Sequence, residues 1–262
     1  MELEFAHALD TGRARSNNED AVRVDETLAL AVLADGMGGY NAGEVASAMA
    51  ADCMQAGIAQ WLAAPDAARD DGQIRQALMA TAQHANQVVF DAAQSRPEYA
   101  GMGTTLVTAL FEPGRVWVGH IGDSRAYRLR GGRLEQLSRD HSLLQEQIDA
   151  GLLTPEEAAY SMNRNLVTRA VGVEPTVELE VVDHELRVGD TILLCSDGLS
   201  DMLPDASIAQ VMRASDSLAG TARALVDAAN AAGGRDNISV VLVRAKGGAA
   251  QSGRAWWPFR RS

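Results

Sequence analysis

Cysteine is scarce in this sequence, with only Cys53 and Cys195 among 262 residues, and both lie within apolar patterns. Two cysteines in such positions are typical of reduced core thiols in a cytoplasmic protein rather than of a disulfide framework. No apolar run approaches the roughly 20 residues that a membrane-spanning helix needs, and the first residues lack the basic and apolar segments of a signal peptide. We therefore expect a soluble cytoplasmic protein without a transmembrane segment.

Positive charge is also scarce, since 23 lysines and arginines stand against 35 aspartates and glutamates, for a formal net charge of −12. Phosphate backbones select basic protein surfaces, so this balance argues against nucleic acid as a partner. The acidic excess fits either a solvated surface or a group of carboxylates around cations. Nearly half of the residues are apolar, and the length allows one large domain or two small ones with a substantial core.

Hydrophobic periodicity predicts pairs of helices between blocks of strands, without an internal repeat. The expected strands are 3–9, 21–24, 28–34, 104–111, 116–121, 126–129, 134–137, 177–182, 191–195 and 238–244. The expected helices are 41–63, 73–93, 142–150, 206–212 and 218–231, with a further short helix that Thr154 and Glu157 open as a capping box. Because the first two helices each have one apolar face, we expect helix pairs to cover antiparallel sheets. The polar segment at about 140–165 interrupts the strands and is interpreted as an inserted flap.

The stretch around residue 35 is the one around which we expect the chain to be organised. An apolar run over 28–34, long enough for a strand buried on both faces, ends in Asp35-Gly36-Met37-Gly38-Gly39. The glycines let the backbone turn tightly and approach a ligand closely. Asn41 can then cap a helix, with Glu44 as its capping-box partner. A carboxylate is thus expected where a strand stops and a loop begins.

Aspartates recur at the ends of the expected strands. They are Asp20, Asp35, Asp123, Asp197 and Asp236. Any one of them alone is more often a turn or cap residue, but five could converge if the strands end at one edge. Five like charges would raise one another's pKa values and destabilise the fold unless cations neutralised them. Oxygen ligands favour Mg²⁺ or Mn²⁺, and no pattern supports histidine or cysteine ligation of zinc.

Seven motifs in order carry a resemblance to a known family. They are Thr11-Gly12 with Arg15 and Asn18-Glu19-Asp20, Ala34 to Gly39, Met102-Gly103-Thr104-Thr105-Leu106, Gly119 to Arg125, Asp140-His141-Ser142, Ser196-Asp197-Gly198-Leu199 and Asp236-Asn237-Ile238-Ser239. From about residue 3 to residue 245 the chain resembles the metal-dependent protein serine/threonine phosphatases of type 2C, in their compact bacterial form. The resemblance implies an α+β fold, a four-layer α-β-β-α sandwich with two central antiparallel β-sheets flanked by helix pairs and a small flap. It places the phosphatase domain at 1–246.

The same resemblance implies a centre with two core Mn²⁺ or Mg²⁺ ions. By position, Asp35 would bridge both ions, and the Gly36 carbonyl would bind one of them. Asp20 would contact the second ion, directly or through water. Asp197 and Asp236 would complete the first. A water activated between the two ions would then attack phosphorus in line.

Further roles follow by position. Asp123, with Asp197, would hold a weaker third ion. Arg15, five residues before Asp20, matches the arginine that clamps the substrate phosphate through its planar fork, whereas Asn237 would shape the metal loop. Met37 stands where eukaryotic relatives have a histidine, so the general acid stays open, with a metal-bound water as the first candidate.

The implied function is hydrolysis of phosphoserine and phosphothreonine in proteins by a monomeric enzyme, opposing a bacterial serine/threonine kinase. A catalytically silent metal-binding scaffold, a regulator-specific phosphatase and a small-molecule phosphatase on the same fold remain alternatives.

The tail at 247–262 forms a separate segment. Its first residues, 247–253, have the composition of a flexible linker, and three aromatic residues then follow among three arginines. We expect a mobile or folded-back tail, with a docking peptide or an interfacial membrane anchor as the alternatives.

Overall fold

The computed structural model describes residues 1–38, 42–64, 70–154, 157, 166–215 and 217–247. Asn41, most of the short helix expected after Thr154, and the tail after Gly247 lie outside these residues. Thr154 and Glu157 do form the expected capping box, because the Thr154 amide donates to Glu157 Oε2 at 2.8 Å and the Glu157 amide donates to Thr154 Oγ1 at 3.2 Å. None of the described helices combines the length and apolarity that crossing a membrane requires.

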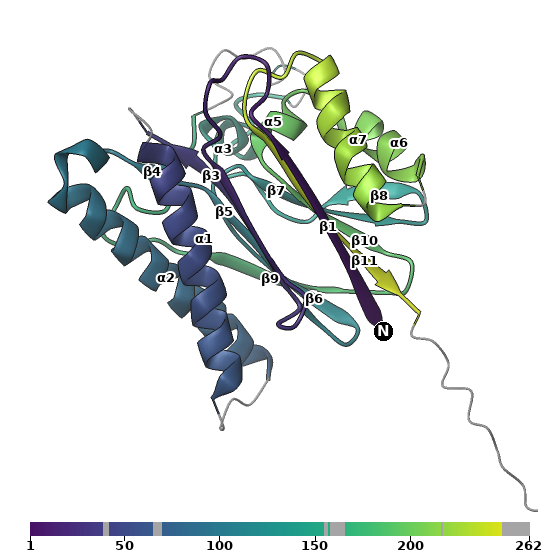
Figure 1. Ribbon diagram of the computed structural model, residues 1–262, viewed down its shortest axis with the longest axis horizontal. Coiled ribbons are helices and arrows are strands. Elements are labelled where there is room, and N and C mark those ends of the chain that lie inside the picture. Colours follow the sequence, from purple (N-terminus) through teal and green to yellow (C-terminus); the bar gives the residue numbers. More distant parts are fainter. Residues whose placement is uncertain (39–41, 65–69, 155–156, 158–165, 216, 248–262) are drawn as a thin grey trace, which may run out of the picture.

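Two antiparallel sheets form the centre of the molecule (Figure 1). The five-stranded sheet has the order β1 (Glu2–Asp10), β11 (Ile238–Lys246), β10 (Thr191–Cys195), β7 (Arg125–Arg130) and β8 (Arg133–Gln136). The six-stranded sheet has the order β2 (Asp20–Asp25), β3 (Leu30–Met37), β5 (Leu106–Glu112), β6 (Arg115–Ile121) and β9 (Glu180–Glu185), with β4 (Gly103–Thr104) paired to the end of β3.

Strand β3 shows why the sheets stack. Side chains alternate along a strand, and Ala31 and Leu33 pack against Ile192, Leu194 and Val241 of the other sheet. The intervening side chains of β3 pack against the outer helices instead. Apolar residues are therefore needed on both faces, which explains the unbroken apolar run in the sequence.

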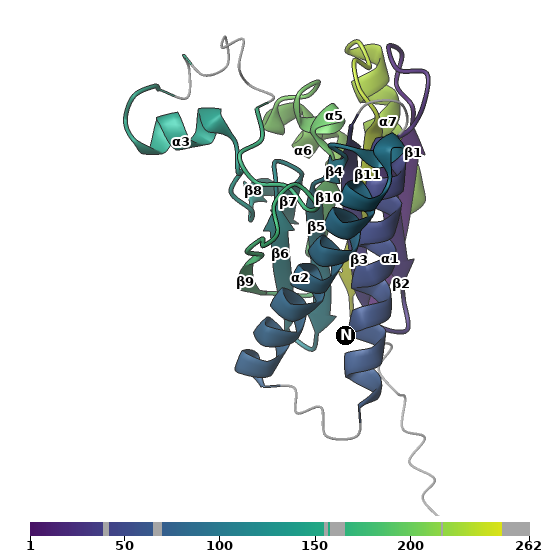
Figure 2. The same ribbon diagram turned by 90° about the vertical axis from the view of Figure 1, so that its left-hand side faces the viewer.

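Helix pairs cover the two outer faces (Figures 1 and 2). Helices α1 (Ala42–Ala63) and α2 (Asp71–Ser95) lie on the six-stranded sheet, and α6 (Asp205–Arg213) and α7 (Leu218–Ala231) lie on the five-stranded sheet. Figure 2 shows the short helix α3 (Leu143–Asp149) at the upper end, away from both helix layers. The predicted α-β-β-α sandwich of the α+β class is confirmed.

Three local predictions were wrong. The strand expected at 177–182 is β9, at Glu180–Glu185, because the Val177 amide bonds to Gln83 of α2 instead of pairing with β6. The strand expected at 104–111 is divided at Thr105, whose amide turns to the Asp35 carbonyl. On α1, Cys53 is only partly buried, because the helix face that contacts the sheet runs through Ala50 and Met54.

Candidate metal centre

The five predicted aspartates come from both sheets. Asp20 and Asp35 lie opposite each other on β2 and β3. Asp123 lies between β6 and β7, Asp197 opens the short helix α5 (Asp197–Ser200) after β10, and Asp236 precedes β11. Burial raises the pKa of Asp35 well above its usual range, and the negative charges of the four other aspartates raise it further. The expected convergence is therefore present.

Asp35 is held more rigidly than the sequence suggested. Strand β3 does not stop before it but continues to Met37, and Gly36 pairs with Thr104 of β4. The Asp35 amide donates to Thr105 Oγ1 at 3.0 Å, and its carbonyl accepts from the Thr105 amide at 2.9 Å and from Thr104 Oγ1 at 2.8 Å. A side chain at Gly36 would overlap the Glu19 and Gly43 carbonyls, so only glycine fits there.

The electrostatics of the centre fit bound cations. Burial raises the pKa values of Asp20 and Asp123 to about 6, and burial followed by the charge of Asp123 raises that of Asp197 well above its usual range. One carboxylate oxygen of Asp20 and one of Asp197 are buried without a hydrogen-bond partner among the described residues. Such acceptors are costly unless an ion or water satisfies them. Carboxylate and carbonyl oxygens are the donors that Mg²⁺ and Mn²⁺ prefer.

Arg15 lies at the rim of this group. Its Nη2 is 2.7 Å from Asp236 Oδ2, and its side chain is 54% exposed, so one side of the guanidinium meets solvent. Hydrogen bonding to Asp236 raises the pKa of Arg15, and Glu19 and Asp197 add to the effect. The residue is thus a fixed positive charge beside the aspartates.

Asn237 ties the surrounding loops together. Its Nδ2 donates to the carbonyls of Thr11 at 3.0 Å and Asn17 at 2.8 Å, while its Oδ1 accepts the Glu19 amide at 2.8 Å. The side chain is buried. These three bonds fit the predicted loop-shaping role and connect the segment of Arg15 and Asp20 to that of Asp236.

The sequence analysis missed one carboxylate of the centre. Asp201 lies one turn after Asp197 and raises the pKa values of both Asp123 and Asp197. The spacing of four residues would have indicated it, because residues i and i+4 face the same side of a helix.

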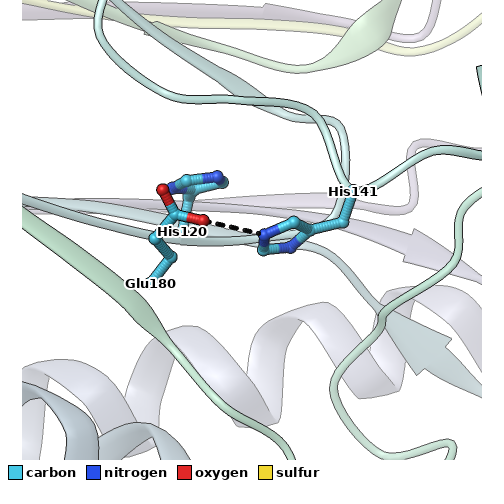
Figure 3. Close-up of side chains that lie close together, drawn as sticks. All are labelled: His120, His141 and Glu180. Atoms are coloured by element: carbon cyan, nitrogen blue, oxygen red, sulfur yellow. Dashed lines mark hydrogen bonds and ion pairs between the residues drawn. The ribbon is translucent and has the colours of Figure 1, made fainter. Parts of the chain in front are cut away.

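It also missed a group of histidines. His120, His141 and Glu180 bring three ligand atoms within 4.8 Å of one another (Figure 3), a closeness that no other histidine, cysteine, aspartate or glutamate triplet reaches among the described residues.

A cavity of about 640 Å³ extends from Met37 to the segment that follows the flap. Arg169, Glu174 and Glu178 are among its lining residues, together with apolar side chains such as Val173 and Val177. It therefore offers both charged and apolar contacts beside the end of β3.

Comparison with known proteins gives consistent matches. The family model described as protein phosphatase 2C matches residues 12–237. The serine/threonine phosphatase stp of Listeria monocytogenes serovar 1/2a is 37% identical over 246 residues, which cover 93% of this chain and 95% of that protein. The serine/threonine protein phosphatase PstP of Mycobacterium tuberculosis H37Rv is 39% identical over 243 residues, which cover 92% of this chain and 44% of PstP.

Comparison with solved structures also matches the chain to serine/threonine phosphatases. A crystal structure of M. tuberculosis PstP/Ppp has a TM-score of 0.85 at 37% identity and covers 94% of this chain and 100% of that one. A structure of the PstP catalytic domain in complex with two manganese ions has a TM-score of 0.82 at 37% identity and covers 94% of this chain and 99% of that one.

Proposed function

The chain belongs to the protein phosphatase 2C family, and from that premise we propose how its residues carry out the reaction. The relatives are serine/threonine phosphatases, and one of them is solved with two manganese ions. The chain is a metal-dependent phosphoprotein phosphatase, a hydrolase that uses divalent cations and acts on phosphorylated proteins. The individual roles that follow are our proposal.

Asp35 would hold both core cations, together with the Gly36 carbonyl, Asp197 and Asp236 for the first and Asp20 for the second. Asp197 and Asp123 would together hold a weaker third cation. The observation that carries this assignment is that Asp20 and Asp197, whose pKa values are raised, each bury one carboxylate oxygen without a hydrogen-bond partner among the described residues. The charge of Asp201 acts on both Asp123 and Asp197, so Asp201 would add to the attraction for a cation at the third site.

Bound cations of this kind supply a water that ionises near neutral pH and offset negative charge on the phosphoryl group. The protein's part is to keep the carboxylates in place, through the strand pairing of Asp35 and the loop contacts of Asn237. Arg15 binds two phosphate oxygens with its planar fork, at the rim where it now meets Asp236. Met37 has no proton to donate, so the proton that the leaving alkoxide needs would come from water or from another group, and the general acid stays open.

We further propose that the cavity beside Met37 receives the substrate polypeptide. It begins at the end of β3, and its charged residues would contact the substrate residues on either side of the phosphorylated one. The catalytic unit is 1–246, and it acts as a monomer opposite a serine/threonine kinase. Both Mn²⁺ and Mg²⁺ suit the oxygen ligands.

The test is loss and recovery of phosphopeptide hydrolysis. Activity should vanish in excess EDTA and return with Mn²⁺ or Mg²⁺. Asp35→Asn and Asp236→Asn should each lower kcat by several orders of magnitude, because each removes a charged ligand with little change in volume. Activity in excess chelator, or an active Asp236→Asn variant, would refute the two-cation assignment. Turnover of sugar phosphates but not phosphopeptides would indicate a small-molecule phosphatase, and no turnover of either with cations bound would indicate a silent scaffold.

A further inference from the structure

The loop that carries Asp123 is hydrogen-bonded on two sides. On the core side, Thr105 Oγ1 lies 2.7 Å from Ser124 Oγ and also accepts the Asp35 amide. On the flap side, the His141 amide donates to the Gly122 carbonyl at 2.9 Å, and the Gly122 amide donates to His141 Nδ1 at 3.2 Å. One histidine therefore satisfies both backbone groups of the residue before Asp123.

The backbone at Gly122 leaves little freedom for another arrangement. Its φ is +98°, and a Cβ there would lie 2.8 Å from Thr105 Cγ2. Only glycine fits this close approach. Because no side chain at position 122 can hold the loop, the bonds of Gly122 to His141 and of Ser124 to Thr105 hold the backbone on both sides of Asp123.

His141 itself is firmly fixed. It is buried, its ring stacks on His120 with centroids 4.7 Å apart, and its Nε2 lies 3.4 Å from Glu180 Oε2 (Figure 3). Its carbonyl accepts the Thr168 amide at 2.8 Å, so the two ends of the flap segment meet at this residue. The ring is thus held by β6, β9 and the base of the flap together.

The hydrogen bonds define the state of the ring. Because Nδ1 accepts from Gly122, the proton of a neutral ring lies on Nε2, facing Glu180. Burial, followed by the charge of His120, lowers the pKa of His141, which favours this neutral form. A cation bound through Nε2 would move the proton to Nδ1, where it would oppose the Gly122 amide donor to donor. The three close ligand atoms are therefore better explained as a hydrogen-bonded support than as a cation site.

We propose that His141 is a positioning residue for Asp123, acting through the Gly122 amide. The inference rests on the proposed third cation site at Asp123. Without an acceptor at Nδ1, the Gly122 amide loses its partner and the loop can turn, so the third cation binds more weakly. The core cations should remain bound, because Asp35 is also held by Thr104, which pairs with Gly36 and donates its hydroxyl to the Asp35 carbonyl.

The experiment is calorimetric titration of Mn²⁺ into the full-length wild type and four variants. Asp123→Asn should lose the weakest site. In His141→Gln the side-chain amide lies near the position of Nε2, so the Gly122 amide has no acceptor at the position of Nδ1. The Mn²⁺ affinity of the weakest site should then fall about tenfold, as it does when other residues that orient metal ligands are replaced. His141→Asn can place an amide oxygen near Nδ1 and should restore the affinity to within about threefold. Glu180→Gln should match the wild type. Two retained core sites show that each variant is folded.

Each alternative gives a different pattern. Wild-type affinity at the third site of His141→Gln would overturn the inference and leave the proposed site at Asp123 standing. An unchanged titration of Asp123→Asn would remove that site and the inference with it. If His141→Asn and Glu180→Gln both lost a site that Asp123→Asn retains, the histidine group would be a cation site and the positioning role would be wrong. As a second readout, His141→Gln should need more Mn²⁺ for half-maximal kcat, with KM for phosphopeptide unchanged.

Discussion

Replacement of Asn237 by alanine tests whether the loops around the aspartates are organised by this one side chain. The change removes the bonds to Thr11, Asn17 and Glu19. A hydrogen bond in a folded protein contributes about 1 kcal/mol net, so the free energy of unfolding in chelator should fall by about 3 kcal/mol. That part of the effect is structural and says nothing yet about cations.

The cation-dependent part is a second, separate quantity. A site filled at 100 times its dissociation constant stabilises the folded state by about 2.7 kcal/mol. If the loosened loops weaken that site tenfold, the same Mn²⁺ concentration stabilises the variant by only about 1.4 kcal/mol. The difference in stability between wild type and Asn237→Ala should therefore grow by about 1.3 kcal/mol on adding Mn²⁺.

Urea unfolding with and without Mn²⁺ measures both quantities. Asn86→Ala is the matched control, because Asn86 is also buried and makes two bonds, to the Glu174 carbonyl and the Gly172 amide, neither of which belongs to the loops that Asn237 joins. It should lower the stability but leave the gain from Mn²⁺ at its wild-type value. Equal gains from Mn²⁺ in Asn237→Ala and the wild type would refute the reasoning.

Three further predictions concern the rim, the tail and acid stability. Arg15→Ala should raise KM for phosphopeptide more than it lowers kcat, since Arg15 binds the ground-state phosphate; a fall in kcat at constant KM would assign it to the transition state. A chain ending at Lys246 should hydrolyse p-nitrophenyl phosphate at close to the full-length kcat, and a large loss would mean that the tail contributes to the site. Burial lowers the pKa of His184 in the folded protein below the value of about 6.5 that it has in the unfolded chain. The folded state therefore has its full stability above about pH 6.5 and loses part of it as the pH falls toward the folded pKa, because the unfolded chain takes up the proton first. Urea unfolding of His184→Gln should therefore show a smaller loss of stability between pH 7 and pH 5 than the wild type, and an equal loss would contradict this.

The sequence predicted the fold where its information is local or carried by motifs. The apolar run of β3 and the apolar face of α2 predicted which of their side chains are buried, and the ordered motifs identified the family. The assigned cation ligands remain a prediction, although the structure brings all five aspartates together.

The errors occurred where distant residues decide the local structure. Nothing near Val177 in sequence indicates that Gln83 will take its amide and delay β9. Likewise, the turn of Thr105 toward Asp35 depends on a strand 70 residues earlier. The histidine group joins β6, the base of the flap and β9, so no spacing rule could have found it. Asp201 differs, because its helical spacing from Asp197 was visible and overlooked.

The pairing of Asp20 with Asp35 has a consequence for how the enzyme would respond to its cations. These two acidic residues face each other across β2 and β3, and like charges in directly opposed positions weaken a strand pair. Strand β2 lies at the edge of its sheet, so β3 is the only strand with which it pairs among the described residues. Removal of divalent ions should therefore loosen this edge first, and amide hydrogen exchange in β2 would report cation occupancy without any substrate being present.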